Sequence, residues 1–320
     1  MRKKIIERTR QFIRDRSLFG VRIAVLRYLW FIVIRLPRSF AGPVLRYKHG
    51  LIIRNLKQVL GERAFLENEC RGSEASGGVC RGNEPIWFCW LQGAGQMPPL
   101  VKICYDSVCR NSFGHPVIFV DLRSLERYVA LPKSVLALFD AGRISPANFT
   151  DIIRTALLAQ HGGLWLDATV YVSEPLPAWI FARRFYSVKF SSVDDFYIAG
   201  GRWSNFALGG MSSSMIYGRL LRLLYDYVER KGDFVDYFQM DYLIHLLYQS
   251  DSNVRAEIDN VPVNNEGVHR MQRVLNRRFS EVVLRHIEDS AFLHKLSWRT
   301  PLRSPHRAES LFWAHLAGLN

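Results

Sequence analysis

The chain has 320 residues and a mass of 37.0 kDa, of which 48% are hydrophobic, 13% aromatic and 22% charged. Because so much apolar surface must be buried, this composition excludes a disordered, collagen-like or coiled-coil chain. The longest uncharged apolar run near the N-terminus, residues 28–34, is far shorter than the roughly 18 apolar residues of a membrane-spanning helix, which excludes a polytopic membrane protein. We therefore expect a globular protein with one principal domain and an appendage.

The positive charge lies almost entirely at the N-terminus. Residues 1–60 hold 15 of the 43 Lys and Arg but only two acids, Glu7 and Asp15, so they carry +13 of the net charge of +14. Within them, residues 18–36 form an apolar stretch that arginines interrupt. A secretory signal has an unbroken apolar core and a small-residue cleavage site, so this stretch does not resemble one. We expect the chain to stay cytoplasmic.

An apolar face flanked by Lys and Arg is typical of a helix that lies on an anionic membrane surface. We therefore interpret residues 1–60 as a basic amphipathic segment that holds the protein, as a peripheral protein, on the inner face of the cell membrane. Two alternatives stay open: a helix packed on the body with solvated arginines, and nucleic-acid binding. We expect no nucleic-acid partner, because the remaining residues carry only +1 and residues 1–60 contain no recognisable nucleic-acid module.

Residues 61–84 are expected to form a linker or loop. The stretch 68–84 is rich in Gly and Ser and contains two similar pentapeptides, CRGSE and CRGNE, which begin at Cys70 and Cys80. Five cysteines are an odd number in a chain without an export signal, so we expect reduced thiols. No CxxC or nearby His pair completes a zinc site, so we do not expect these cysteines to bind metal.

From residue 85 onward, strands and helices alternate. Residues 86–91 (IWFCWL) predict a buried strand, and the prolines at 98–99 begin a helix that extends to residue 109. Residues 115–121 (HPVIFVD) predict a second strand, with two short helices after it. This repetition indicates an α/β fold with a mainly parallel, Rossmann-like sheet and flanking helices, in which ligands bind at the carboxyl ends of strands.

The clearest helix covers residues 146–161 (PANFTDIIRTALLAQH). Ser145 is the expected N-cap, a proline takes the first position, and a Gly-Gly pair follows the last turn. Residues 164–172 (LWLDATVYV) then predict one buried strand with a single charge, Asp167, in its middle. Such a charge is costly unless a metal, an Arg or several hydrogen bonds satisfy it, so Asp167 is the leading candidate for function.

Four stretches together resemble the capsular polysaccharide synthesis protein family, whose members are sugar-nucleotide-dependent glycosyltransferases related to the DXD-containing sugar transferases. The resemblance covers about residues 85–300. It implies a GT-A-like fold for residues 85–320, a nucleotide-diphosphate sugar as donor, and Mn²⁺ or Mg²⁺ as cofactor. The stretches are 85–104 (PIWFCWLQGAGQMPPLVKIC), 144–176 (ISPANFTDIIRTALLAQHGGLWLDATVYVSEPL), 235–248 (VDYFQMDYLIHLLY) and 292–298 (FLHKLSW).

The resemblance implies roles for three donor-binding residues. Trp90 matches an aromatic residue that stacks on the nucleotide base, and a core Trp is the alternative. Asp151 and Arg154 match positions that contact the sugar hydroxyls and the phosphates of the donor. Their chemistry suits these roles, because a carboxylate accepts from hydroxyls and a guanidinium binds a diphosphate in a fork. The alternative is an exposed i,i+3 ion pair on a helix.

Asp167 matches the first acid of the DXD motif, but the motif here reads Asp167, Ala168, Thr169 and lacks the second acid. The resemblance implies that Asp167 binds the metal and that Thr169 holds a metal-bound water or a sugar hydroxyl. One carboxylate is compatible with Mg²⁺ or Mn²⁺ that shares substrate phosphates. A buried structural Asp is the alternative.

Asp241, in YFQMDYLIHLLY, matches an acid in a helix of the related enzymes. We expect Asp241 or the nearby Asp236 to face the acceptor. For Asp236, a position on a solvated helix face is the favoured alternative. No pair of carboxylates with clear acid and base roles emerges from the sequence, so we assign no general base.

The FLHKLSW stretch resembles the C-terminal segment that closes over the donor diphosphate in this family. His294 would then ligate the metal, and Lys295 would neutralise the leaving group. Ser297 and Trp298 are expected to bind the donor with them. For His294, a hydrogen-bonded core histidine is the alternative.

The sequence thus predicts a glycosyltransferase that moves a sugar from its nucleotide donor to a glycan or lipid-linked acceptor in surface polysaccharide synthesis. Metal, Arg154 and Lys295 would stabilise the charge that develops on the departing diphosphate. Retention of the anomeric configuration is implied by the resemblance. The alternatives are a catalytically inactive sugar-nucleotide-binding or glycan-binding protein and a basic nucleic-acid-binding protein. No GxSxG, HExxH or P-loop pattern supports a hydrolase.

Overall fold

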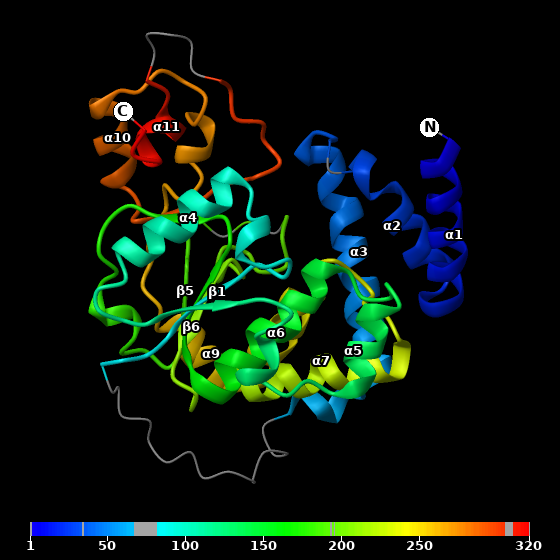
Figure 1. Ribbon diagram of the computed structural model, residues 1–320. Helices are drawn as coiled ribbons and strands as arrows, with labels where there is room; N and C mark the ends of the chain where they lie inside the picture. Colours follow the sequence, from blue (N-terminus) through cyan, green and yellow to red (C-terminus); the bar gives the residue numbers. More distant parts are fainter. Residues whose placement is uncertain are drawn as a thin grey trace.

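A computed structural model describes residues 2–33, 35–66, 82–192, 194, 196–304 and 310–319 (Figure 1). The pentapeptides at Cys70 and Cys80 lie outside the described residues. The helices of the described part are α1 (Arg2–Phe19), α2 (Val21–Val33), α3 (Arg38–Leu60), α4 (Pro99–Arg110), α5 (Lys133–Asp140), α6 (Pro146–His161), α7 (Tyr217–Lys231), α8 (Gln239–Ser250), α9 (Ser252–Asp259), α10 (Glu281–Glu288) and α11 (Phe312–Leu316). The strands are β1 (Ile86–Cys89), β2 (Val117–Val120), β3 (Gly163–Asp167), β4 (Val170–Val172), β5 (Tyr186–Ser187), β6 (Ala207–Gly210) and β7 (Leu293–Lys295).

The main sheet has the strand order β2-β1-β3-β6-β5. β1 pairs in parallel with β2 on one side and with β3 on the other, whereas β6 is antiparallel to both of its neighbours. Four of these five strands therefore run in one direction, which confirms the prediction of an α/β fold with a mainly parallel sheet. The GT-A assignment is finer than this topology and stays a prediction.

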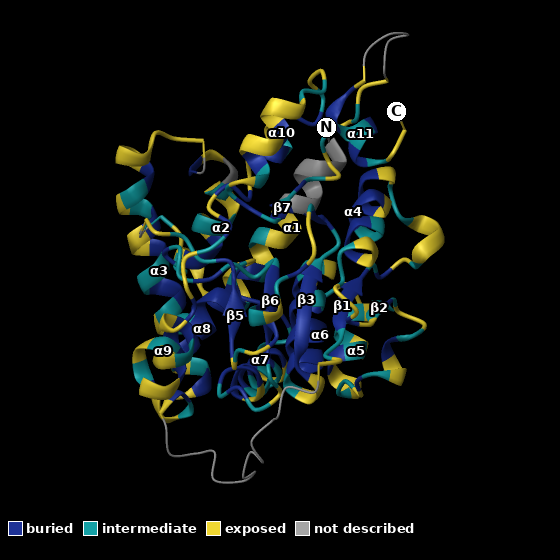
Figure 2. Cartoon of the chain, turned by 90° about the vertical axis from the view of Figure 1, so that its left-hand side faces the viewer, coloured by how far each residue is buried: buried dark blue, intermediate teal, exposed yellow. Residues whose placement is uncertain are grey.

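The alternation of side chains along each strand divides the core around the main sheet into two hydrophobic clusters. Trp87 and Cys89 of β1 face the cluster that contains α6 and α7, whereas Ile86 and Phe88 face the cluster that contains α4. Figure 1 shows α4 above the sheet and α6 below it, and in Figure 2 the central strands are coloured as buried. The sheet is thus the middle of three layers, as expected for an α/β domain.

Helix α6 has the bounds that the sequence predicts. Ser145 caps it by accepting a hydrogen bond from the Asn148 N–H at 3.2 Å, and Gly162 follows its last turn with a positive φ. The helix is buried on its polar side as well as its apolar side, since Asp151 and Arg154 are also buried. A buried charged face indicates that these side chains contact other groups inside the protein.

The prediction of a single strand over residues 164–172 is wrong. The chain turns at Ala168 and Thr169, so that β3 ends at Asp167 and β4 pairs with β7 in a separate two-stranded sheet. The β1–β3 register ends with Cys89 opposite Asp167. Asp167 therefore lies at the carboxyl end of β3, where ligands of α/β sheets bind, and not in the middle of a strand.

The N-terminal helices pack on the body. Phe19 of α1, Ile23 of α2 and Leu56 of α3 belong to the same hydrophobic cluster as α6 and α7, and Arg14 forms an ion pair with Asp233 at 2.7 Å. The inward face of these helices therefore matches the alternative of a helix packed on the body. No helix in the described part of the chain combines the length and apolar character needed to cross a membrane.

The beginning of the expected linker is ordered. Residues Glu62–Phe65 form a short 3-10 helix, Phe65 is buried, and Arg219 of α7 donates a hydrogen bond to the Phe65 carbonyl at 3.0 Å. The chain therefore stays attached to the body up to this point. The division into domains at residues 60 and 84 stays a prediction.

Candidate functional site

A cavity of about 950 Å³ opens at the carboxyl ends of β1 and β3. Its walls come from α2, α3, α6 and α8 and from the loops around β3, β6 and β7. Nine of the ten site residues expected from the sequence line it, although they come from separate parts of the chain. They are Trp90, Asp151, Arg154, Asp167, Thr169, Asp241, Lys295, Ser297 and Trp298.

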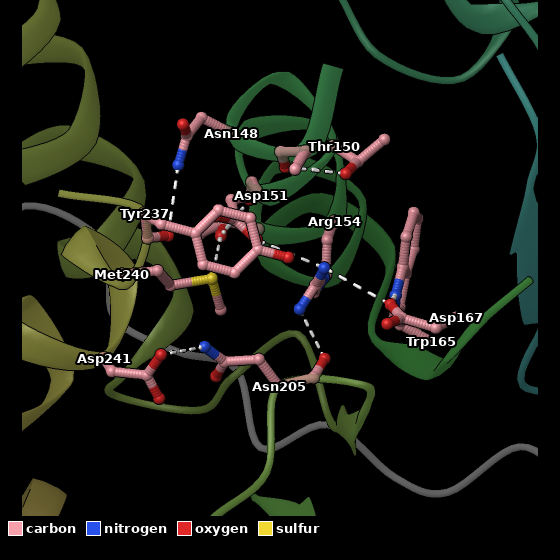
Figure 3. A network of polar contacts seen from close by, with 12 residues as sticks. Asn148, Thr150, Asp151, Arg154, Trp165, Asp167, Asn205, Tyr237, Met240 and Asp241 are labelled. Atoms are coloured by element: carbon pink, nitrogen blue, oxygen red, sulfur yellow. Dashed lines mark hydrogen bonds and ion pairs between the residues drawn. The ribbon is translucent and has the colours of Figure 1, made fainter. Parts of the chain in front are cut away.

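Arg154 is the centre of the polar network in this cavity (Figure 3). Its guanidinium lies 3.2 Å from Asp151 Oδ1, one helical turn away, and 3.3 Å from Asp167 Oδ1 at the end of β3. It also donates a hydrogen bond to the Asn205 carbonyl. The side chains of Arg154 and Asp151 are only 6% and 12% exposed, so the alternative of an exposed ion pair is wrong.

The alternation of β3 explains why Asp167 meets Arg154. Trp165 and Asp167 point to the same face of the sheet, the face that α6 covers, and the Trp165 Nε1–H donates to Asp167 Oδ1 at 2.9 Å. The Arg154 guanidinium lies over the Trp165 ring, 5.1 Å from its centroid. Local strand geometry therefore holds the carboxylate, the indole and the guanidinium together.

The pairing of β4 with β7 brings a second cation to Asp167. Lys295 is opposite Val170 in this pairing, and the next residue, Leu296, donates its N–H to the Thr169 carbonyl. The Lys295 ammonium thereby lies 2.7 Å from Asp167 Oδ2 and 2.9 Å from Thr169 Oγ1. Asp167 therefore bridges two cations from distant segments, which answers the question of what satisfies its charge.

Three carboxyl groups of the cavity, those of Asp167, Asp151 and Asp241, differ in pKa for physical reasons. Burial alone would raise the pKa of Asp167, but the charges of Lys295 and Arg154 outweigh it and lower this pKa to about 2. Burial raises the pKa of Asp151 to about 7, against the opposing effect of Arg154. Burial also raises the pKa of Asp241 to about 6, although hydrogen bonds oppose it. Of these three groups, Asp167 is the one that is far from its titration range at neutral pH.

Asp241 lies across the cavity, in the first turn of α8. Its carboxylate accepts hydrogen bonds from Trp203 Nε1 at 2.9 Å and from Asn205 Nδ2 at 2.7 Å. Asp236 precedes α8 and is buried, with a 2.7 Å ion pair to Lys48 of α3. The favoured alternative of a solvated helix face for Asp236 is therefore wrong, because Lys48 neutralises it inside the protein.

Two tryptophans form an aromatic corner at the cavity wall. Trp90 and Trp298 meet edge to face, with ring centroids 6.0 Å apart and an interplanar angle of 90°. Trp90 is only partly buried and donates its Nε1–H to the Gln96 carbonyl, and Trp298 is 46% exposed. Ser297, between Lys295 and Trp298, donates its backbone N–H to Gln272 Oε1 at 2.6 Å. Trp90 thus lies at the cavity and is not a sealed core residue.

The expected metal pair of Asp167 and His294 is not formed. His294 is fully buried, and its Nε2 lies 3.0 Å from Ser173 Oγ. Because neighbouring residues of a strand point to opposite faces, His294 points away from the cavity that Lys295 enters. Burial lowers the pKa of His294 to about 4. His294 matches the alternative of a hydrogen-bonded core histidine, and its assignment as a metal ligand is wrong.

The donor set around Asp167 does not fit a divalent metal. The nearest charged groups are an ammonium and a guanidinium, and both oxygens of Asp167 are already engaged by them. Among the residues that the structure describes, no group of three or more His, Cys, Asp or Glu side chains could hold a metal ion. A single carboxylate can hold Mg²⁺ or Mn²⁺ together with substrate phosphates, but here both of its oxygens face cations that a metal ion would have to displace.

The sequence prediction missed the residues that the N-terminal helices contribute to the cavity. Trp30 of α2 and Lys48 and His49 of α3 line it, and the Lys48 ammonium lies 3.8 Å from the centroid of the Trp30 ring. One signal was present: Lys48 is spaced three residues from both Leu45 and Leu51, which are buried. A lysine on the inward face of an amphipathic helix indicates a paired internal charge.

The chain was compared with known proteins. Over residues 43–314, which is most of its length, it matches a family model described as capsular polysaccharide synthesis protein. The match begins within α3 and so extends further towards the N-terminus than the resemblance over residues 85–300. A search of curated proteins found no match.

Proposed function

Because the chain belongs to the capsular polysaccharide synthesis protein family, we propose that it is a glycosyltransferase. It transfers a sugar from a nucleotide-diphosphate sugar to a glycan or lipid-linked acceptor of a surface polysaccharide. The observation that carries this proposal is the convergence of nine donor-site candidates on one cavity, with Arg154 and Lys295 joined by Asp167. Their side chains come from distant segments and line one open cavity, as a shared ligand would require.

The chemistry of the transfer needs positive charge at the leaving group. When the anomeric C–O bond breaks, its electron pair passes to the terminal phosphate oxygen of the nucleoside diphosphate. The acceptor oxygen bonds to the anomeric carbon and gives up its proton to the departing diphosphate or to solvent. Arg154 and Lys295 would stabilise the diphosphate more strongly as this charge develops, which lowers the barrier. We propose retention of the anomeric configuration, following the family resemblance.

The other side chains suit the rest of the donor. The corner of Trp90 and Trp298 offers aromatic faces on which a nucleotide base could stack. Asp151 and Asp241 flank Arg154 and could accept hydrogen bonds from sugar hydroxyls. Ser297 and Thr169 add hydroxyl groups next to Lys295. A donor would thus extend from the aromatic corner across Lys295 to the carboxylates.

The N-terminal helices support a proposal for the acceptor and for its membrane. Trp30, Lys48 and His49 line the cavity, while α2, the turn after it and the start of α3 expose apolar side chains. These exposed residues are Val21, Val25, Tyr28, Leu29, Ile32, Leu36 and Phe40. We propose that this face lies on an anionic cytoplasmic membrane surface, so that a lipid-linked acceptor reaches the cavity from the bilayer.

The test is the release of nucleoside diphosphate from a panel of nucleotide sugars in the presence of membranes that carry the acceptor. We expect turnover with one donor class, and a loss of roughly a hundredfold or more in Asp167→Asn and Arg154→Met. Arg285→Met, which removes an exposed arginine of α10 paired with Glu281, is the matched control. Full activity of Asp167→Asn would refute the proposed function, and donor binding without turnover would favour the inactive binding protein.

A further inference from the structure

The position where the DXD motif of the related sugar transferases has its second acid is occupied here by a different arrangement. The DXD pattern ends at Thr169, and the Lys295 ammonium fills the space between Asp167 and this hydroxyl at 2.7 and 2.9 Å. A positive side chain therefore lies where a second carboxylate would help to hold a divalent cation. A metal ion and an ammonium cannot share this place, because they repel each other and compete for the same oxygens.

The carboxylates around Arg154 are also engaged. Asp167 Oδ1 accepts from Trp165 Nε1 and lies against Arg154, and Asp151 lies against Arg154 as well. Asp241 accepts from the Trp203 indole and the Asn205 amide. These contacts come from α6, β3, α8 and the segment before β6, so separate parts of the fold build them.

The two cations have the charge and the donors that a diphosphate requires. One Lys and one Arg supply the same formal charge as one divalent metal, and both line the cavity. An ammonium has three N–H bonds, of which Asp167 and Thr169 use two. The third can donate to a phosphate oxygen, while Asp167 fixes the position of the ammonium.

We infer that the diphosphate of the donor binds to this protein without a divalent cation, and that Lys295, with Arg154, takes the place of the metal. This inference rests on the proposed function, since it concerns the same cavity. The protein would then not need the Mn²⁺ or Mg²⁺ that the family resemblance implies. Asp167 is then the residue that orients Lys295 and not a metal ligand.

The experiment measures binding to the full chain by calorimetry, with inorganic pyrophosphate and a panel of nucleoside diphosphates as probes. Each titration is performed in EDTA and again in Mn²⁺, and Mn²⁺ alone is titrated as a third arm. Because Mn²⁺ also binds diphosphates in solution, we expect an affinity in EDTA at least as high as in Mn²⁺. We also expect no Mn²⁺ binding that Asp167→Asn abolishes. Thermal unfolding, which bound ligand shifts upward, supplies an independent readout.

Variants assign the effect to Lys295. Lys295→Met should weaken diphosphate binding about 10- to 100-fold, because it removes a charge-assisted hydrogen bond and leaves Asp167 to repel the anion. Lys295→Arg should restore part of the affinity. The matched control is Lys102→Met on α4, where an exposed ammonium forms a 2.9 Å pair with Asp106 outside the cavity.

The outcomes separate this inference from the proposed function. Diphosphate binding that requires Mn²⁺ would overturn the inference and leave the glycosyltransferase proposal standing. Unchanged binding in Lys295→Met would also overturn it, because another group would then hold the phosphates. If no diphosphate binds in either buffer, the proposed function fails and the inference fails with it.

Discussion

Asp167 and Asp151 both pair with Arg154, but their pKa values differ because only Asp167 also pairs with Lys295. Asp167 has Lys295 as a further cation, and the two positive charges outweigh burial and lower its pKa to about 2. Asp151 has no second cation in this network, so burial dominates and raises its pKa to about 7. The same arginine therefore holds one group ionised and leaves the other near its titration range at neutral pH.

This difference predicts a pH dependence. If ionised Asp151 and Asp241 accept from sugar hydroxyls, kcat/KM should rise with pH through the range of about 6 to 7, where both lose their protons. Asp151→Asn should be less active and should lack the upper part of this rise. The measurement is a pH profile of kcat/KM for the unmodified protein and for Asp151→Asn. A rise of the same shape in the variant would contradict the role of Asp151.

Stability should respond to pH in the opposite direction. Because the folded-state pKa of Asp151 is raised above that of the unfolded chain, the folded state binds its proton more tightly, and the free energy of unfolding falls as pH rises from about 4 to about 7. Urea unfolding at several pH values should show a shallower fall in Asp151→Asn. An identical slope in both proteins would show that Asp151 is not buried as described.

The buried pair of Lys48 and Asp236 gives a further prediction. Lys48→Met should reduce the free energy of unfolding by about 3–5 kcal/mol, because it leaves Asp236 as an uncompensated buried charge. Lys48→Met with Asp236→Leu should recover much of this loss. Lys102→Met, which breaks an exposed pair, should cost less than about 1 kcal/mol. Equal effects of the two single variants would contradict the burial of the pair.

At the scale of elements, the Gly-Gly pair after α6 determines how the helix enters β3. Gly162 and Gly163 both have positive φ, of 68° and 93°. A Cβ on Gly163 would lie 2.2 Å from the Pro85 carbonyl, which accepts the Leu164 N–H next to β1. The sequence signal that ends the helix therefore also permits the close contact that aligns β3 with β1.

Gly163→Ala should consequently lower the free energy of unfolding by roughly 2–4 kcal/mol, through strain and displacement of β3. It should also weaken donor binding, because Asp167 lies at the end of that strand. Gly218→Ala in α7 is the control: its Cβ would meet nothing within 4 Å, so no loss of stability is expected. Chemical denaturation of both variants measures the difference, and a neutral Gly163→Ala would refute this account.

Local sequence pattern was sufficient to predict the bounds of α6 but not the break between β3 and β4. The bounds of α6 followed from its cap, its proline and its glycines, since these act within a few residues. The turn at Ala168 and Thr169 carries no Gly, Pro or Asn, so the apolar residues on both sides looked like one strand. Pairing with β7, more than 100 residues later, separates β4 from β3.

At the scale of the molecule, the N-terminal helices have two faces with different partners. Their inner face belongs to the core and to the cavity wall, as Ile23 and Lys48 show. Their outer face exposes apolar side chains and arginines, including Arg22, Arg35 and Arg38. Removing residues 1–60 would therefore unpack the core, and substitutions on the outer face are the better test of membrane binding.

We predict that replacing Val25, Leu29 and Ile32 with Ser reduces binding to anionic liposomes by roughly tenfold or more, because each side chain loses apolar contact with the bilayer. Binding should also weaken as salt concentration rises. Vesicle flotation measures both effects. The control replaces three exposed apolar residues of the body, Leu122, Val263 and Val282, with Ser. Equal loss in the two triple variants would contradict the proposed membrane face.

The sequence by itself determined the alternation of strands and helices, the bounds of α6 and the basic N-terminus, because capping, turn residues and hydrophobic periodicity act over short distances. It also nominated nine residues that line the cavity, through the family resemblance. Only the tertiary structure decided which side chains touch. β7 brings Lys295 to Asp167 and directs His294 into the core, and Lys48 of α3 lines the cavity wall and pairs with Asp236. These contacts join segments far apart in sequence, so their geometry depends on how strands pair and helices pack, which no local pattern encodes.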